Sequence, residues 1–198
     1  MRKSAELRRA EIIGIVLKLA DRIGPDRVTT GAVATEVGVT QAALFRHFPT
    51  KSAMWQAVAE HVVDRLTAAW NAAIVGRDSP VERLTSLFAA QLEQIAISPA
   101  LPMLLFSREL NVENTALREA FHGRLTTLQS LLSREFAAGQ RLGIFRADVA
   151  ARDVALLVTA LIQSVAIRWS LGARDFELRN EGLRLLRVQL RLLTALEK

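Results

Sequence analysis

The chain has 198 residues and a net charge of +6, and 51% of its residues are hydrophobic. This length suits one or two domains with a proper core, and the apolar content argues against a disordered chain. Because the chain has no cysteine, disulfides, thiolate metal sites and a cysteine nucleophile are excluded.

The first part of the chain predicts helices separated by clear breaks. Apolar residues recur at helical spacing from Ile12 to Ile23, and Gly24-Pro25-Asp26 ends that pattern. Thr30 can cap a short second helix with its hydroxyl. Gly38 permits the left-handed backbone that ends this helix and turns the chain sharply.

A third, short helix starts at Thr40 and is stopped by Pro49, after which Thr50 can cap a longer helix over residues 51–74. Two short helices joined by a tight turn that contains glycine form a helix-turn-helix unit, whose second helix can lie in the major groove of DNA. The same arrangement also occurs in ordinary helical bundles, so the spacing alone leaves both interpretations open.

The residues of the third helix favour the first interpretation. The segment GVTQAALFRHFPTK resembles the recognition-helix signature of the TetR/AcrR family of bacterial transcriptional regulators. It matches that signature at Gly38, Val39, Leu44, His47, Phe48 and Lys51, with conservative replacements at Thr40, Phe45 and Thr50. It departs at Ala42, where the family usually has glycine, and at Phe45, where a family tyrosine commonly reaches a DNA phosphate. The resemblance is strong over residues 8–66 and covers only the general layout beyond them.

On this resemblance, particular side chains are expected to touch DNA. Thr40, Gln41 and Ala43 would read base edges, because the Gln41 amide can pair bidentately with adenine and the Ala43 methyl suits a thymine methyl. Phosphate contacts would come from Thr29, Thr30, Arg46, His47 and Lys51, with Phe45 at the position of the family tyrosine. Leu44 and Phe48 are expected to pack inward.

Charge is distributed unevenly along the chain. Residues 1–51 carry nine Lys and Arg against five Asp and Glu, whereas the remainder carries seventeen against fifteen. This asymmetry fits a surface that faces phosphate, although a solvated basic face would show it too. Arg2, Lys3, Arg8 and Arg9 form either a basic arm along DNA or a frayed terminus.

A second group of helices is predicted after a boundary at residues 76–80. Ser79-Pro80-Val81-Glu82 indicates a capping box with proline in the first turn, and Ser98-Pro99 stops the helix that follows. The further expected helices are a short one through Leu104, Leu105 and Phe106, one from about Asn114 to Ala138 broken by Gly139 and Gly143, one from Val149 to Leu171 that Asp148 caps and Gly172 closes, and one from near Phe176 to Leu196.

No strand pattern, internal repeat or low-complexity segment interrupts these helices. The sequence therefore predicts an all-α fold of about nine helices. We expect a helix-turn-helix DNA-binding domain at residues 1–50 with its motif at 29–48, a connecting helix at 51–74, and a helical effector-binding and dimerisation domain at 79–198. The number of helices matches the layout usual in the family.

The last two helices carry more apolar surface than one core requires. On the last helix, Leu183, Leu186, Leu190 and Leu193 form one stripe, and Leu185, Val188 and Leu192 form another. A surface helix needs one apolar stripe, so a second indicates either a partner or complete burial within the chain. The resemblance implies a four-helix dimer interface, which we assign to the first stripe. A homodimer also suits a pseudo-palindromic operator.

Signals for catalysis are absent from the sequence. His47, His61 and His122 form no metal-ligand spacing with carboxylates, and no catalytic serine motif or glycine-rich nucleotide loop is present. We therefore expect neither an enzyme nor a metal or other cofactor. No signal peptide is visible, and the longest charge-free run, Val154 to Ile167, is too short to span a bilayer, which favours a cytoplasmic soluble protein.

An effector pocket is expected among the helices of the second domain. Its apolar walls would come from Phe88, Met103, Phe106, Phe121 and Trp169, and its polar groups from Gln91, His122, Thr159 and Gln163. Gln163 is the candidate anchor, although a partner within the protein or the dimer would satisfy the same amide.

These expectations combine into a homodimeric transcriptional regulator that binds double-stranded DNA sequence-specifically, as a repressor released by a small apolar or amphipathic molecule. Two alternatives stay open. One is a DNA-bound nucleoid-occlusion or chromosome-organising factor of the same fold, which the segment AALFRHFPTK also resembles. The other is a helical ligand-binding protein that has lost DNA binding.

Overall fold

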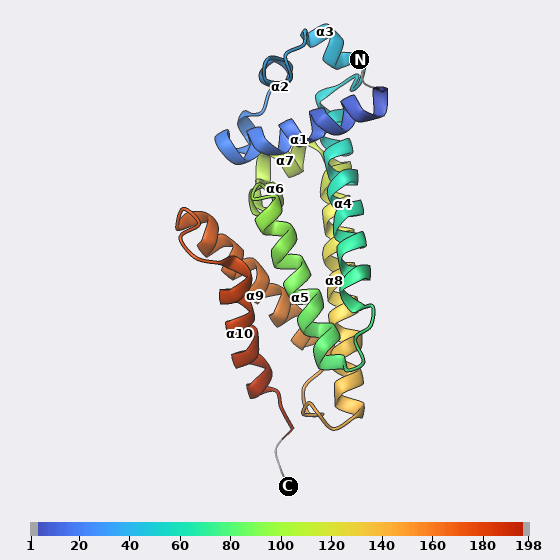
Figure 1. Ribbon diagram of the computed structural model, residues 1–198, viewed down its shortest axis with the longest axis vertical. Coiled ribbons are helices and arrows are strands. Elements are labelled where there is room, and N and C mark those ends of the chain that lie inside the picture. Colours follow the sequence, from blue (N-terminus) through green and yellow to red (C-terminus); the bar gives the residue numbers. More distant parts are fainter. Residues whose placement is uncertain (1–3, 196–198) are drawn as a thin grey trace. The chain divides into compact units, whose positions relative to one another are not determined.

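Helices make up the regular structure of the part of the chain that the structure describes. The computed structural model describes residues 4–195, in which ten α-helices and one short 3-10 turn make up the fold (Figure 1). These residues contain no β-strand, and only an isolated bridge joins Phe145 to Thr194. The all-α prediction is confirmed, with one helix more than expected.

The helices are distributed over two compact units. The head unit is Met1–Asp64 with Ser98–His122, and the body unit is Arg65–Ile97 with Gly123–Lys198. Two long helices, α4 (Lys51–Ile74) and α8 (Thr115–Arg141), begin in the head unit and end in the body unit. The head unit thus includes the predicted DNA-binding domain and, in addition, two short helices after Ser98.

The head unit begins with α1 (Ala5–Ile23), which starts earlier than the apolar periodicity because the Ser4 hydroxyl accepts the amide of Leu7. The turn η1 (Pro25–Arg27) follows. The cap of the next helix, α2 (Thr30–Val37), is Thr29 and not Thr30 as predicted. Either hydroxyl could serve, but the Thr29 oxygen accepts the amide of Ala32 at 3.1 Å.

Two short helices, α6 (Leu101–Phe106) and α7 (Arg108–Glu113), complete the head unit. The sequence analysis did not predict α7. Its cap is Ser107, whose hydroxyl accepts the amide of Leu110 at 3.0 Å and donates its proton to the carboxylate of Asp26 in η1. The Asn111 side chain donates to the carbonyl of Leu104 at 3.0 Å, which ties α7 back to α6. Polar caps, not apolar periodicity, therefore define this segment.

The body unit is built from α5 (Pro80–Ile97), α9 (Ala151–Leu171) and α10 (Leu178–Leu192) with the adjoining parts of α4 and α8. The predicted capping box is confirmed, because the Glu82 amide donates to the Ser79 hydroxyl and the Ser79 amide donates back to the Glu82 carboxylate, at 3.1 and 3.3 Å. The last helix ends at Leu192 and does not continue through residue 195, so it is shorter than predicted. Leu196, its predicted end, lies outside the described residues.

The cap predicted for α9 is not used. Asp148 is instead paired with Arg146 at 2.6 Å, and this hydrogen bond lowers the pKa of the Asp148 carboxyl. The residue that precedes α9 is Ala150, which has no side-chain oxygen to accept a hydrogen bond from the first amides of the helix. A nearby arginine has therefore taken the carboxylate that the helix amides would otherwise bind.

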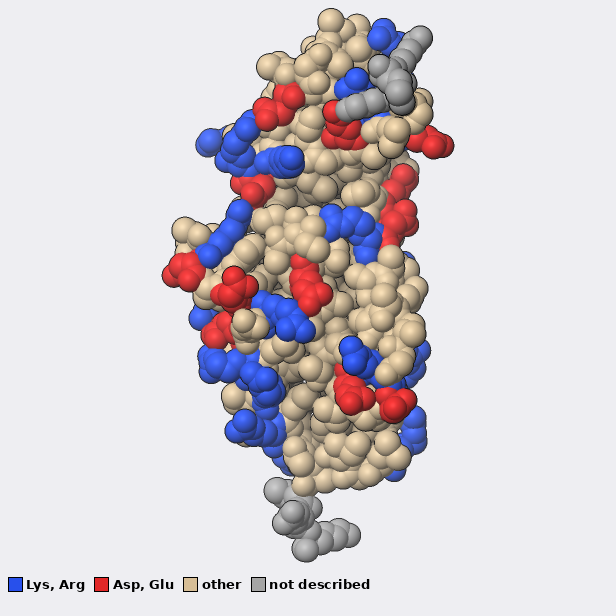
Figure 2. Space-filling model, viewed as in Figure 1, with Lys and Arg blue, Asp and Glu red and all other residues tan. Residues whose placement is uncertain are grey.

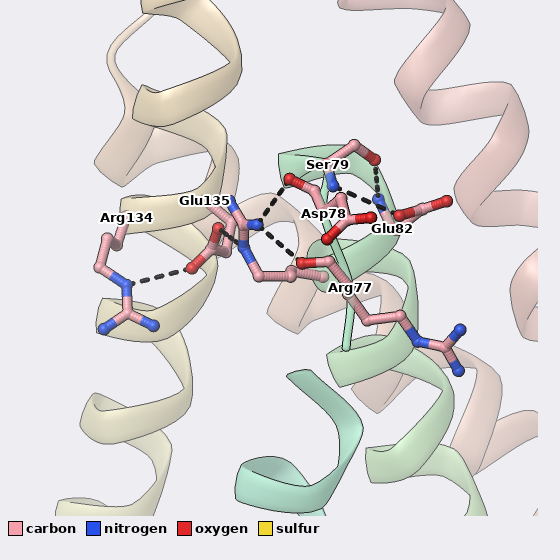
Figure 3. A network of polar contacts seen from close by, with 7 residues as sticks. Arg77, Asp78, Ser79, Glu82, Arg134 and Glu135 are labelled. Carbon is pink, nitrogen blue, oxygen red and sulfur yellow. Dashed lines mark hydrogen bonds and ion pairs between the residues drawn. The ribbon is translucent and has the colours of Figure 1, made fainter. Parts of the chain in front are cut away.

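A polar network fixes the loop between α4 and α5 against α8 (Figure 3). The Arg83 guanidinium donates to the Glu135 carboxylate at 2.6 Å and to the carbonyl oxygens of Arg77 and Asp78 at 3.0 Å each. Arg134 also donates to Glu135, at 3.1 Å. Because Glu135 is only 3% exposed, its charge requires these partners.

Two glycines let elements of the body approach closely. Gly139, predicted to break α8, lies inside that helix, and a Cβ there would be 2.4 Å from the ring of Phe145. That ring stacks on Phe136 with centroids 4.3 Å apart. Gly182 of α10 lies equally close to α5, because a Cβ there would be 2.2 Å from Leu92 Cδ1.

We predict that Gly182→Ala destabilises the protein by about 1–2 kcal/mol. The added methyl group would force the buried Leu92 side chain to move, and overpacking of this kind costs roughly 1–3 kcal/mol, from which the better helix propensity of alanine subtracts up to about 1 kcal/mol. The measurement is urea-induced unfolding.

The matched control is Gly123→Ala on α8, where a Cβ would meet no atom within 4 Å. This variant should be as stable as the wild type or more stable by up to about 1 kcal/mol. Equal stability of the two variants would contradict the close packing of α10 on α5.

Candidate nucleic-acid interface

The second and third helices of the head unit form a helix-turn-helix with local caps at every bend. Gly38 ends α2 in the left-handed region at φ 75°, ψ 37°. The Thr40 hydroxyl accepts the amide of Ala43 at 3.2 Å and so starts α3 (Gln41–Phe45). The Thr50 hydroxyl accepts the amide of Ala53 at 2.9 Å and starts α4. These three local predictions are confirmed.

The side chains of α3 divide between core and solvent. Leu44 and Phe48 are 1% and 2% exposed, so they anchor the segment as predicted. Gln41, Arg46 and Phe45 are exposed, the last at 39%. The predicted base readers at positions 40 and 41 and the predicted phosphate contact at 46 therefore lie on the solvent side of the same short segment.

The candidate base reader Gln41 is held by a neighbouring helix. Its amide nitrogen donates to the hydroxyl of Thr30, the first residue of α2, at 2.8 Å. A carboxamide has two N–H donors and an acceptor oxygen, so this bond uses one donor and leaves the other donor and the oxygen. The remaining pair is the set that recognises adenine, which needs one donor and one acceptor.

The hydroxyls that cap these helices keep a donor for phosphate. The oxygens of Thr29 and Thr40 each accept a backbone amide in α2 and α3. A threonine hydroxyl also carries a proton that it can donate. Capping is therefore compatible with the phosphate contact predicted for Thr29 and with the base contact predicted for Thr40.

Charged groups around the motif are partly engaged with one another. Arg22 of α1 pairs with Glu36 of α2 at 2.7 Å, and this hydrogen bond and the arginine charge hold the pKa of Glu36 below its ordinary value. Arg22 is thus engaged within the head. Arg46 has no hydrogen bond or ion pair within residues 4–195, and Lys51 lies half-buried at the start of α4.

The basic residues of the N-terminus fall into two groups. Arg2 and Lys3 lie outside the described residues. Arg8 and Arg9 belong to α1 and have partners in the head, since Arg8 pairs with Glu11 at 2.9 Å and Arg9 donates to the carbonyl of His47. The contact between Arg9 and His47 joins residues 38 apart, and no local sequence pattern indicates it.

The nine residues predicted to line an effector pocket are not brought together in one unit. Met103, Phe106, Phe121 and His122 belong to the head unit, and Phe88, Gln91, Thr159, Gln163 and Trp169 belong to the body unit. Met103 and Phe106 are 46% and 51% exposed, and His122 is also exposed.

Two of the polar residues in that set have partners inside the body unit. The Gln91 amide oxygen accepts the indole N–H of Trp70 at 3.0 Å, and the Thr159 hydroxyl donates to the carbonyl of Ala155 at 2.7 Å. Gln163 is half-buried. Gln91 and Thr159 therefore already have hydrogen-bond partners within the body unit, whereas Gln163 is partly accessible to solvent.

One pocket of the body unit has a volume of about 510 Å³ and lies at the C-terminal ends of α5 and α9. Trp169 is the one predicted effector residue that lines it, beside Ile97 and Phe176. The guanidinium of Arg174 lies 5.3 Å from the centre of the Trp169 ring. The sequence does not indicate this pocket, because its other walls come from three separate segments: the end of α5, the loop between α9 and α10, and the start of α10.

The two apolar stripes of α10 differ in how far the chain itself covers them. Leu186 and Leu190, assigned to a dimer interface, are 0% and 9% exposed and pack within their own chain, where α10 contacts α5 and α9. Val188 and Leu192 of the other stripe are 47% and 71% exposed. The sequence shows two stripes but gives no sign of which one the chain itself covers. Leu183 and Leu193 of the first stripe and Leu185 of the second are half-exposed.

The described residues contain no group of three or more His, Asp and Glu side chains that could hold a metal ion. By length and composition, α9 could cross a membrane. The charge-free run from Val154 to Ile167 is shorter than the helix that contains it, because α9 is 21 residues long. The core helices of soluble proteins meet the same test, and eight residues of α9 are buried in the body unit, so this is weak evidence for a span.

Residues 17–58 match the profile of bacterial regulatory proteins of the tetR family. This match covers α2, α3 and the start of α4, which carry the helix-turn-helix.

Similar sequences include nucleoid occlusion factors. The chain is 29% identical over 126 residues to the nucleoid occlusion factor SlmA of Vibrio campbellii, covering 63% of this chain and 64% of the relative. It is 30% identical over 118 residues to SlmA of Haemophilus ducreyi, covering 59% and 58%. The chain thus matches less than two thirds of the length of these relatives.

Solved structures of transcriptional regulators have the same fold over nearly the whole chain. The ketosteroid transcriptional regulator KstR2 of Mycobacterium tuberculosis superposes with a TM-score of 0.76 at 20% identity, covering 99% of this chain and 98% of that one. The fatty acid degradation regulator FadR of Bacillus halodurans gives 0.76 at 16%, covering 96% of each chain. A TetR-family regulator of Agrobacterium tumefaciens gives 0.79 at 18%, covering 97% and 100%.

We predict that Gln91→Leu destabilises the body unit by about 1–3 kcal/mol. The substitution leaves the indole N–H of Trp70 in the core without its acceptor, and an unsatisfied buried donor costs about that much. The measurement is thermal or urea-induced unfolding.

Gln163→Leu is the matched control, because it makes the same chemical change on a half-buried helix position and should alter stability by less than about 0.5 kcal/mol. If Gln91→Leu is as stable as wild type, the Trp70 bond does not support the scaffold.

Proposed function

We propose that the chain is a regulator of the tetR family, a homodimeric, sequence-specific repressor of transcription that a small molecule releases from DNA. The observation that carries this proposal is the solvent-facing set on α3, in which Gln41 is held by Thr30 with one donor and one acceptor left over. Such a pair recognises a base edge, whereas a structural surface helix has no need of an oriented amide.

Phosphate contacts would come from the residues around this reader. Arg46 is exposed beyond α3, Lys51 lies at the start of α4, and the hydroxyl of Thr29 keeps its proton. Contacts of this kind fix register on the duplex but carry no sequence information. The excess of Lys and Arg in residues 1–51 adds a favourable potential for DNA.

A specific observation favours a second candidate function. Similar sequences with 28–30% identity are named nucleoid occlusion factors. A factor of that kind would also bind DNA through a helix-turn-helix, so the head unit suits both functions. They differ in the number and placement of their sites, because a repressor acts at a few promoters and a chromosome-bound factor at many dispersed positions.

Dimerisation is proposed through the exposed apolar faces of α9 and α10. Leu156 and Leu157 of α9 are 44% and 57% exposed, and Val188 and Leu192 of α10 belong to the same unit. Lys and Arg side chains gather along the edge where α10 lies (Figure 2). Arg187 of α10 is exposed. An apolar centre with a charged rim is the usual composition of a protein interface.

The proposed effector is apolar or amphipathic. The names of two regulators of the same fold refer to ketosteroids and to fatty acid degradation, and ketosteroids and fatty acids are largely apolar molecules. To act as an inducer, the molecule must bind the form that cannot hold DNA more tightly than the form that can, since equal affinity shifts nothing. The protein would act at the nucleoid in the cytoplasm.

We predict that Gln41→Ala weakens binding to the cognate operator by about 1–3 kcal/mol and changes binding to random DNA much less, because the lost contact reads a base edge. The operator is obtained by selection from a random DNA pool, and affinity is measured by fluorescence anisotropy over a series of salt concentrations.

Lys51→Ala serves as the comparison variant, since loss of a phosphate contact should weaken both DNAs about equally and reduce the salt slope by about one. If Gln41→Ala weakens random DNA as much as operator, Gln41 does not read bases. If the wild type shows no salt-dependent binding at all, the chain is a helical protein without DNA binding.

We predict that Val188→Arg and Leu157→Arg each convert the dimer into a folded monomer. Both side chains are exposed in the single chain, so arginine is tolerated there, whereas in the dimer its charge would be buried without a partner. Sedimentation velocity measures the mass, and circular dichroism checks the fold.

Val75→Arg places the same residue at another exposed apolar position, 74% exposed on the loop after α4, and should leave the dimer intact. A dimer that survives both Val188→Arg and Leu157→Arg would exclude this face as the interface.

A further inference from the structure

Arg9 of α1 reaches the segment that follows the reader helix. Its guanidinium donates through Nη1 to the carbonyl oxygen of His47, and its Cζ lies 4.4 Å from the centre of the Phe48 ring. Within residues 4–195 these are the only polar and ring contacts of Arg9, so no carboxylate pairs with it. This exposed arginine therefore contacts one backbone carbonyl and one ring face and no carboxylate among the described residues.

The His47 carbonyl lies just beyond the end of α3, so its contact with Arg9 can fix the C-terminal end of that helix. The reader helix α3 has five residues, which is too short to be stable on its own. Its carbonyl at Leu44 accepts the amides of His47 and Phe48 at 2.9 and 3.0 Å, which closes the C-terminal turn. The carbonyl of His47 points beyond that turn and is the one that Arg9 binds.

The two ends of α3 are therefore held by two different helices. At the N-terminal end, Gln41 is bound to Thr30 of α2. At the C-terminal end, His47 and Phe48 are bound to Arg9 of α1. Phe48 is 2% exposed, so its ring is fixed in the core and offers Arg9 a rigid surface.

Arginine is better suited than lysine to make both contacts at once. Its planar guanidinium can stack on a ring while an N–H in the same plane donates to a carbonyl. A lysine ammonium keeps the charge but has no plane to stack, and its strong hydration favours water over the ring. The chemistry at position 9 is therefore more specific than its charge.

We propose that Arg9 is a positioning residue for DNA recognition, which sets the orientation of α3 and so determines how strongly the protein prefers its operator over random DNA. This inference rests on the proposed function. Base-edge contacts need a well-defined geometry, because a bidentate amide must meet two atoms of one base. Phosphate contacts are less selective, so a small rotation of α3 should reduce operator binding and spare non-specific binding.

The test compares Arg9→Lys and Arg9→Met with Arg8→Met in the full-length protein. Arg8 is the neighbouring arginine on the same helix, and its partner Glu11 belongs to α1 and not to α3. For each variant, affinities for the selected operator and for random DNA are measured over a series of salt concentrations, and thermal unfolding is followed in parallel.

We expect Arg9→Lys to weaken operator binding about tenfold, which is within the range of one lost base contact. The affinity for random DNA should stay within about twofold of the wild-type value, and the slope of log affinity against log salt concentration should change by less than about 0.3. Arg9→Met should lose the same operator preference, and Arg8→Met should keep the wild-type ratio of the two affinities.

Three results would overturn the inference. In the first, Arg9→Lys binds the operator as tightly as wild type and Arg9→Met reduces the salt slope by about one, which would mean that Arg9 contacts a phosphate. A lowered melting temperature with an unchanged affinity ratio would make it a stabilising residue only. A wild type without any preference for a selected operator would overturn the proposed function and this inference together, whereas the first two results leave the proposed function intact.

Discussion

The short reader helix cannot hold itself, and the head unit is arranged around this constraint. A helix of five residues forms too few internal hydrogen bonds to offset the entropy of its own ordering, so α3 depends on contacts outside it. Burial of Leu44 and Phe48 holds it from below, Thr40 caps its start, and Thr30 and Arg9 hold its two ends. An exposed face that is rigid without being buried is what readout of base edges requires.

Local signals made much of this arrangement predictable. The caps at Thr40 and Thr50, the left-handed turn at Gly38 and the box at Ser79 depend on residues within three positions of each other, and all four are observed. The inward packing of Leu44 follows from helical spacing in the same way. The identity and position of the candidate reader were therefore available from the sequence.

Contacts between distant parts of the chain were not predictable by the same reasoning. Arg9 and His47 are 38 residues apart, and nothing in their neighbours links them. On α10 both apolar stripes satisfy helical periodicity, so only packing against α5 and α9 decides that Leu186 is buried and Val188 exposed. Gly139 suggests a helix break, yet it makes room for a ring from the following loop. These three features share one cause. The spacing of apolar residues describes a single helix but does not identify the elements that pack against it.

The central proposal is that the head unit recognises a specific DNA sequence at a small number of promoters. Chromatin immunoprecipitation with sequencing, in the native host and at natural expression, tests it most directly. The account predicts a few sharp sites upstream of genes, which share one pseudo-palindromic sequence. Many sites dispersed over the chromosome, with no enrichment at promoters, would contradict it and would instead fit a nucleoid occlusion factor such as the relatives that the sequence resembles.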